Sequence, residues 1–188
     1  VAIRELIEYY KGIFTTLSSC ASRQLEEVTF RRATISVPEL MATAGKYFRK
    51  VYKGNKAHID FKIQPLEGRI TGDWNQLRFL LENLIDEACS VTLDGAVCLS
   101  AREDGEFIRF LFTDMRREKT REELNQLFYP DLSRMTAGEK GELYGTEYLV
   151  CKQIIRDHDE FAGHRGCRIN AEPGKEGGFT IYFTLPKK

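Results

Sequence analysis

Hydrophobic side chains recur at helical spacing through the first part of the chain. From Ala2 to Arg32 apolar positions fall every three or four residues, no proline interrupts them, and Gly12 is the weakest helix former. A helix of about 30 residues would be about 45 Å long, which exceeds most globular helices. We expect its apolar stripe to pack in a bundle with a second chain. The alternative is a helix that folds back onto its own domain.

The rest of the chain alternates between helix-like and strand-like patterns. Ser36 or Thr34 can cap a helix that has Pro38 near its first turn, and apolar–polar alternation marks strands. Helices are expected at 36–53, 73–90, 120–127 and 146–158, and strands at 57–63, 69–71, 96–101, 107–113, 167–171 and 178–185. Residues 129–144 are polar and punctuated by glycines, which predicts a mobile loop. The sum predicts an α/β fold: a two-layer sandwich with one mixed sheet, helices on one face, and the long helix in front.

The composition fits one globular domain with an appendage. The chain has 188 residues, of which 42% are hydrophobic, so it can bury a sizeable core. Lys and Arg together number 28, as do Asp and Glu. This neutral balance gives no electrostatic reason to expect nucleic acid or an anionic membrane as the main partner. No run of residues approaches the ~18 apolar positions that a membrane helix needs.

Cysteine and histidine spacing argues against a disulfide framework and against a metal site. The five cysteines are scattered and form no CxxC pair, which favours a reducing, cytoplasmic location. His158, Asp159, His164 and Cys167 cluster within ten residues. Zinc sites show tighter, paired spacing, so no metal is expected here.

The helix expected at 73–90 carries the most informative motif. Residues 72–88 resemble, position for position, the N box of the histidine-kinase-type ATPase domains, the GHKL or Bergerat family. Asn83 stands where that family often has its first asparagine. Glu87 stands where the family normally has an asparagine whose amide oxygen helps to hold the magnesium ion that accompanies ATP. The resemblance implies the family's fold, with a change at a ligand position.

A second family motif follows the strand expected at 107–113. The family carries Asp-x-Gly-x-Gly there, and its aspartate accepts a hydrogen bond from the adenine amine. Asp114 is present, but Arg116 and Glu118 replace both glycines. Glycine lets a backbone approach a ligand closely, and neither replacement does so freely. We therefore expect Asp114 to cap the following turn rather than to hold adenine.

Three further stretches continue the resemblance in the same order. Phe128 matches the phenylalanine of the F box, which is core packing in either case. Gly145 begins a match to the second glycine box, whose backbone amides cradle phosphates in the family. Glu147 replaces the second glycine there, and a carboxylate at a helix start can itself complement the dipole. Residues 168–186 match the closing hairpin.

The resemblance also implies an organisation and partners. It assigns residues 35–188 to the ATPase-like domain and residues 1–34 to the second helix of a dimerisation hairpin. The family's phospho-accepting histidine lies on the first helix of that hairpin, and this chain has no histidine before His58. The chain therefore cannot carry that phosphotransfer by itself. The implied partners are a second copy through the N-terminal helix and a response regulator or sensor domain, either in a cytoplasmic protein or in the cytoplasmic part of a membrane-anchored one.

Three functions are compatible with these residues. The leading hypothesis is a degenerate ATPase domain that acts as a signalling or dimerisation module, with weak or no ATP binding, no cofactor and no catalytic residue. The alternative is an active ATP-dependent histidine kinase domain that uses Mg-ATP, and a small-molecule sensor in the old nucleotide pocket is a third. The vestigial pocket would comprise Asn83, Glu87, Asp114, Arg134, Lys140 and Gly145.

Carboxylates at phosphate-facing positions favour the degenerate hypothesis. A carboxylate about 4 Å from a phosphate costs about 4 kcal/mol at an effective dielectric constant near 20. Glu87 could avoid this cost by binding magnesium directly, whereas Glu147 could not. Arg116 and Arg117 could instead close the pocket by ion pairs with Glu87 and Glu147.

Overall fold

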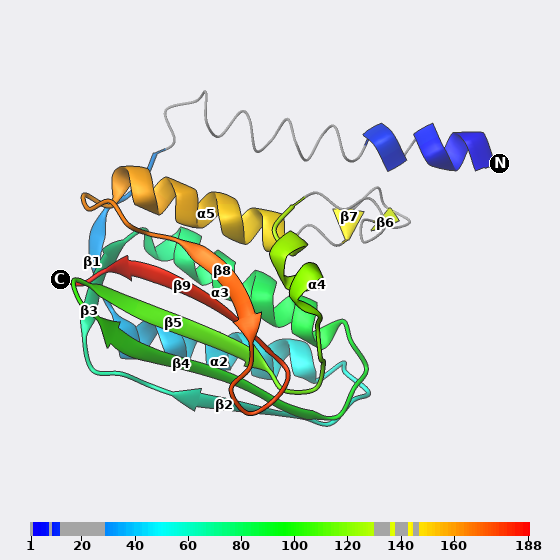
Figure 1. Cartoon of the computed structure of the whole chain (residues 1–188), viewed down its shortest axis with the longest axis horizontal. Coiled ribbons are helices and arrows are strands. Elements are labelled where there is room, and N and C mark those ends of the chain that lie inside the picture. Colours follow the sequence, from blue (N-terminus) through cyan, green and yellow to red (C-terminus); the bar gives the residue numbers. More distant parts are fainter. Residues whose placement is uncertain (1, 8, 12–28, 130–135, 138–142, 145–146) are drawn as a thin grey trace.

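Helices cover one face of a five-stranded mixed sheet, which confirms the expected two-layer α/β sandwich (Figure 1). The computed structural model describes residues 2–7, 9–11, 29–129, 136–137, 143–144 and 147–188. The large helices are α2 (Val37–Tyr52), α3 (Trp74–Cys89) and α5 (Glu147–Phe161), and α4 (Arg121–Gln126) is short. The main sheet has the order β2 (Ile59–Gln64), β4 (Gly95–Asp104), β5 (Phe107–Asp114), β9 (Phe179–Pro186) and β8 (Ile169–Pro173).

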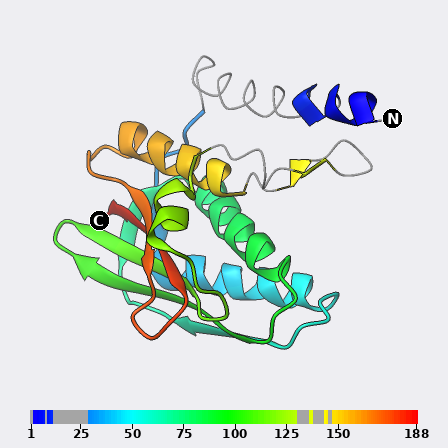
Figure 2. The ribbon, with the colours of Figure 1, turned by 45° about the vertical axis from the view of Figure 1, so that its right-hand side comes forward.

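The sheet is mixed because one of its edges is parallel and the rest is antiparallel. Strand β2 runs parallel to β4, while β4, β5, β9 and β8 pair antiparallel with their neighbours. The turn between β4 and β5 contains Gly105 at a φ of +61°, a conformation that favours glycine. Figure 2 shows α2, α3 and α5 on one side of this sheet, and no described helix covers the other side.

The core lies between the helices and the inward-facing side chains of the central strands. On β5 and β9, Phe110 and Phe183 stack with ring centres 5.0 Å apart. Helix α3 buries an apolar stripe throughout its length: Leu77, Leu80, Leu81, Leu84, Ile85 and Ala88. Phe128 is buried against the ring of Tyr148, which confirms its expected packing role. None of the helices in the described ranges is long and apolar enough to cross a lipid bilayer.

The cap expected at the start of α2 is confirmed, and side chains also cap α3 and α4. Ser36 caps α2 by accepting a hydrogen bond from the Glu39 amide at 3.4 Å. Asp73 caps α3, and its side chain accepts from the Gln76 amide at 3.1 Å. The short helix α4 begins with a reciprocal pair between Thr120 and Glu123. These caps satisfy amides that have no partner inside the helix.

The expected helix over Ala2–Arg32 is wrong at its C-terminal end. Residues 2–7 and 9–11 are helical, and residues 12–28 lie outside the described residues. Residues 29–32 are not helical, and strand β1 (Ala33–Ser36), which pairs antiparallel with β3 (Arg69–Gly72), follows them. The amide of Arg31 donates to the Asp73 carboxylate at 2.9 Å. Tertiary pairing with the domain therefore overrides the helical spacing in this segment.

The stretch 129–144, expected as a loop, contains a short strand pair. Strands β6 (Thr136–Ala137) and β7 (Leu143–Tyr144) pair antiparallel, and residues 130–135 and 138–142 lie outside the described residues. Strands of two residues carry no alternation signal, so the sequence pattern could not predict them.

His158 joins α5 to the start of α3 in the buried interior. Its Nε2 accepts a hydrogen bond from the Asp73 amide at 3.0 Å, and its Nδ1 bonds the Ile154 carbonyl at 2.8 Å. The ring is 0% exposed and lies edge-on to Phe30 with centres 4.8 Å apart. Because its Nε2 accepts, the imidazole is neutral, and burial lowers the pKa of His158 to about 4.

This histidine should make folding stability depend on pH. Its ordinary pKa is 6.5 and its folded pKa about 4, so between these values the unfolded chain binds a proton that the folded chain excludes. Stability is therefore fully present above pH 6.5 and falls as the pH drops, by about 3 kcal/mol in all. The test is urea denaturation of the wild type and of His158→Gln between pH 6.5 and about pH 4. The free energy of unfolding of the wild type should fall relative to that of the variant as the pH drops through this range. Parallel pH profiles of the two proteins would contradict the assignment.

Candidate functional site

Four charged side chains meet where α3 and β5 end. Glu87 lies on the last turn of α3, Asp114 is the last residue of β5, and Arg116 and Arg117 follow it. Asp114 pairs in register with Val97 of β4. Strand β5 therefore ends beside the segment that connects α3 to β4, which brings the four charges together.

The buried carboxylate of Asp114 accepts four hydrogen bonds. Its Oδ1 accepts from the backbone amide of Arg116 at 3.0 Å and from Nε of the same residue at 2.9 Å. Its Oδ2 accepts from Nη2 of Arg116 and from Nε of Arg117, both at 2.9 Å. Burial would raise the pKa of Asp114, but these donors and the two positive charges hold it below its ordinary value. A carboxylate has about four acceptor sites, so the sites of Asp114 are all in use.

The Arg116 side chain passes under the end of α3. It is 0% exposed. Its Nη1 donates to the carbonyls of Val91 at 3.2 Å and Leu93 at 2.9 Å, and its Nη2 donates to the carbonyl of Ala88 at 2.6 Å. Gly95 has a φ of +137°, and a Cβ there would lie 2.8 Å from the Arg116 Cγ. Arg116 thus places a cation and three donors at carbonyl groups of the helix end and the segment after it, where a helix favours positive charge.

Arg117 joins Asp114 to Glu87. Its Nη1 and Nη2 donate to the two carboxylate oxygens of Glu87 at 2.9 and 2.8 Å, a bidentate pair. Its guanidinium carbon lies 5.2 Å from the centre of the Phe179 ring. Burial would lower the pKa of Arg117, but the hydrogen bonds and charge of Glu87 outweigh burial and raise it. Burial, then the charge and hydrogen bond of Glu87, raise the pKa of Tyr148 well above its ordinary value, so α5 also contacts this cluster.

Glu118 fastens the hairpin between β8 and β9 to the same loop. Its Oε1 accepts a hydrogen bond from the Gly178 amide at 2.9 Å. Gly178 has a φ of +70°, and a Cβ there would collide with the Asp114 carbonyl oxygen. Only glycine therefore lets the hairpin approach the end of β5 this closely.

The chain matches known proteins in both sequence and structure. Residues 72–188 match the family model described as "Histidine kinase-, DNA gyrase B-, and HSP90-like ATPase". The chain belongs to this family. A curated relative, the adaptive-response sensory kinase SasA of Thermosynechococcus vestitus, is 25% identical over 177 residues, which make up 93% of this chain and 44% of SasA. The chain thus spans less than half the length of this relative.

Solved histidine kinase structures share the fold. The catalytic domain of the histidine kinase ThkA superposes with a TM-score of 0.63 at 19% identity, covering 84% of this chain and 96% of that one. ThkA in complex with the response regulator protein TrrA gives a TM-score of 0.64 at 18% identity, covering 99% of this chain and 52% of that one. These likenesses establish a histidine-kinase-type ATPase domain at the level of the fold.

The structure places only some of the residues expected in the family's nucleotide pocket. Glu87 and Asp114 meet through Arg117, and the cap expected at Asp114 is confirmed by the bond from the Arg116 amide. Asn83 bonds its own helix instead, donating from Nδ2 to the Phe79 carbonyl at 2.7 Å. Three further predicted residues lie outside the described residues: Arg134, Lys140 and Gly145.

The expected ion pairs are confirmed for one arginine and wrong for the other. Arg117 pairs with Glu87 as expected. Arg116 pairs with Asp114 and the carbonyls beyond α3 rather than with a glutamate. The reason is geometric, because the buried Arg116 guanidinium group reaches the carbonyl groups of Ala88, Val91 and Leu93. Glu147 lies in the first turn of α5, where its charge complements the helix dipole.

The residues considered as metal ligands have other partners. Both ring nitrogens of His158 are hydrogen-bonded inside the core. Asp159 Oδ1 accepts from the amides of Gly166 and Cys167 at 2.7 and 3.0 Å. Among the described residues no group of three His, Cys, Asp or Glu side chains is placed to hold a metal ion.

The sequence alone did not assign three roles in this site. It did not predict that Arg116 bonds a carbonyl of α3, that Glu118 holds the Gly178 amide, or that Tyr148 lies near Glu87. The local spacing of an aspartate and two arginines was a usable signal, because such side chains pair within a turn. The contacts to α3 and to the hairpin depend on tertiary packing and carry no local signal.

Proposed function

We propose that this chain is a degenerate histidine-kinase-type ATPase domain that works as a signalling and dimerisation module with weak or no ATP binding. The observation that supports this most strongly is the set of four hydrogen bonds on Asp114. By the resemblance, Asp114 is the aspartate that would accept from the adenine amine. With its acceptor sites in use, an adenine could bind there only by displacing a guanidinium group from a buried carboxylate, and that displacement costs several kcal/mol.

The magnesium position supports the same proposal. Glu87 stands where the family has a magnesium-binding asparagine, and both of its oxygens bind Arg117. A metal ion approaching Glu87 would meet the positive charge of this guanidinium group. The residues present therefore do not fit Mg-ATP at either position, and we propose no reaction step that uses it.

Calorimetric titration with Mg-ATP tests this proposal. We expect the wild type to show no binding at about millimolar nucleotide, which corresponds to less than about 4 kcal/mol. One variant restores the family residues by Glu87→Asn, Arg116→Gly, Glu118→Gly and Glu147→Gly. We expect that it still does not bind Mg-ATP, because Arg117 still occupies one carboxylate oxygen of Asp114. Adding Arg117→Ala should recover binding by at least about tenfold.

Folding of these variants is checked by their circular dichroism and thermal transitions. Because Arg116 supports the end of α3, the restored variants will be less stable, and the wild-type titration is the primary result. Micromolar Mg-ATP binding by the wild type would overturn the degenerate assignment and favour the active kinase.

We also propose two binding partners for the chain, a second copy of itself and a response regulator. Residues 2–7 and 9–11 are helical and expose Ile3, Leu6, Ile7 and Tyr10, which share one helical face by their spacing. We propose that this face packs against a second copy, in a cytoplasmic homodimer. A response regulator is proposed as a further partner, since the structurally similar kinase ThkA forms a complex with the response regulator TrrA.

The dimer has a direct test in a pair of matched substitutions. Leu6→Glu places a charge on the apolar face, and Arg4→Glu places the same side chain on the polar face of the same turn. Sedimentation equilibrium should give a dimer for the wild type and for Arg4→Glu, and a weakened dimer for Leu6→Glu. A monomeric wild type, or equal behaviour of the two variants, would contradict the proposal.

A further inference from the structure

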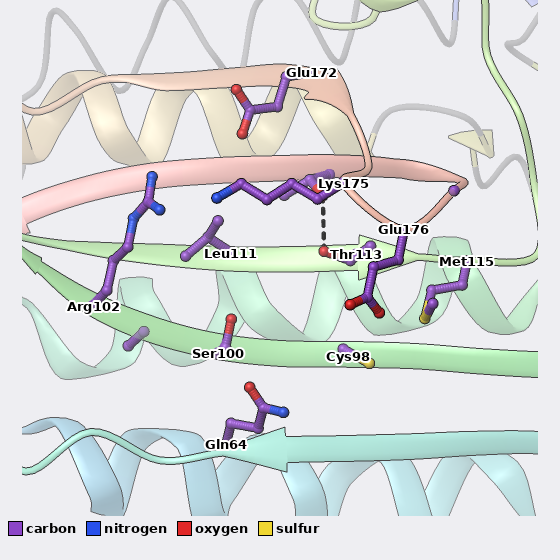
Figure 3. A pocket seen from close by; sticks show the side chains of 13 residues that line it. Gln64, Cys98, Ser100, Arg102, Leu111, Thr113, Met115, Glu172, Lys175 and Glu176 are labelled. Carbon is purple, nitrogen blue, oxygen red and sulfur yellow. Dashed lines mark hydrogen bonds between the residues drawn. The ribbon is translucent and has the colours of Figure 1, made fainter.

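The sheet face that no described helix covers contains a pocket. We call it the outer-face pocket: a hollow of about 430 Å³ bounded by Gln64 and Cys98, by Leu111 and Thr113, and by Lys175 and Glu176 (Figure 3). Its floor is the outward side of the central strands. Its wall is the hairpin between β8 and β9. The volume falls within the range of about 300–1,000 Å³ that is typical of small-molecule sites.

Four charged side chains from separate parts of the sheet point into this pocket. Arg102 comes from β4, Glu172 from β8, and Lys175 and Glu176 from the hairpin. Within the described part of the chain none of these four forms an ion pair. Other charged side chains on this face do pair, as Lys62 does with Asp60 at 3.5 Å. The pocket therefore keeps two positive and two negative groups available to a ligand.

The charged groups of the pocket are spread along the sheet. In Figure 3 the Lys175 side chain extends along the sheet towards Arg102, so the two cationic ends lie at the same end of the pocket, and the carboxylate of Glu172 lies above them on β8. The carboxylate of Glu176 lies farther along, above the strand that carries Ser100 and Cys98. A ligand lying along the sheet would meet Arg102 and Lys175, with Glu172 above them, at one end of the pocket and Glu176 at the other.

This distribution selects a class of ligand. The four formal charges cancel, so an anion or a cation alone would be attracted by two groups and repelled by two. A zwitterion can place its carboxylate near Arg102 and Lys175 and its ammonium group near Glu176, and each contact is then a charge-assisted hydrogen bond. Leu111 on the floor offers apolar contact for a short side chain.

The wall of the pocket is held in place by a residue at a family glycine position. Glu118 accepts from the Gly178 amide at 2.9 Å, and Gly178 lies against the end of β5. Lys175 and Glu176 are therefore presented by a hairpin tied to the loop after Asp114. The substitution that departs from the nucleotide motif thus has a structural role on the other face.

We propose that the outer-face pocket binds a small zwitterion, a free α-amino acid or a short peptide, between Arg102 with Lys175 and Glu176. This site is separate from the nucleotide position, and its test does not involve ATP.

Nuclear magnetic resonance titration of the whole chain tests the site. The probes are a panel of free α-amino acids and glycylglycine, each compared with its N-acetyl and carboxamide forms, which lack one of the two charges. We expect at least one zwitterion to shift the amide resonances of Cys98, Ser100 and Gly177 at millimolar concentration. The two blocked forms should bind at least about tenfold more weakly.

Matched variants locate the binding. Arg102→Gln should weaken it by at least about tenfold, while Lys62→Gln, on the same face but outside the pocket, should leave it unchanged. The proposal is overturned if no zwitterion in the panel shifts these resonances, if blocked forms bind equally well, or if the two variants behave alike. Whether the chain binds ATP concerns only the nucleotide position and does not change how the zwitterion titration is interpreted.

Discussion

The buried carboxylate of Asp114 is the constraint around which this end of the domain is organised. A charge with 1% exposure must be paired, because an unpaired buried charge costs several kcal/mol. Arg116 and Arg117 meet this need, and each then links a further element. Arg116 bonds carbonyl groups at and beyond the end of α3, and Arg117 binds Glu87 on α3 and lies over Phe179 of β9. One aspartate thereby joins a helix and two strands.

The same arrangement explains why several departures from the family pattern occur together. Replacing one loop glycine by Arg116 supplies the cation that Asp114 needs, and Glu87 supplies the anion that Arg117 needs. Glu118, at the second loop glycine, holds the Gly178 amide. Arg116, Arg117 and Glu87 are linked through Asp114, and Glu118 ties the hairpin between β8 and β9 to the same loop, so these positions belong to one connected network. Such clusters couple energetically because their members share partners.

The fold was predictable from the sequence, and the site only in part. The α3 stripe and the Asp73 cap follow from helical spacing and local hydrogen bonding, which one segment specifies by itself. The family boxes placed Glu87 and Asp114 in one site. By contrast, strand β1 was not predicted and the expected helix ran up to Arg32, because the pairing of β1 with β3 is non-local. The path of Arg116 under α3 depends on the space that Gly95 leaves, and no pattern along the chain encodes that space.

The central claim is that the guanidinium groups of Arg116 and Arg117 are fixed on Asp114 and stay there in the presence of nucleotide. The most direct measurement is ¹⁵N–¹H nuclear magnetic resonance of the arginine Nε–H groups, with and without Mg-ATP. Both Nε–H protons donate to Asp114 at 2.9 Å, so we predict resolved signals that exchange slowly with water and do not move when Mg-ATP is added. Rapid exchange of both protons, or a shift of either signal on adding Mg-ATP, would contradict the account.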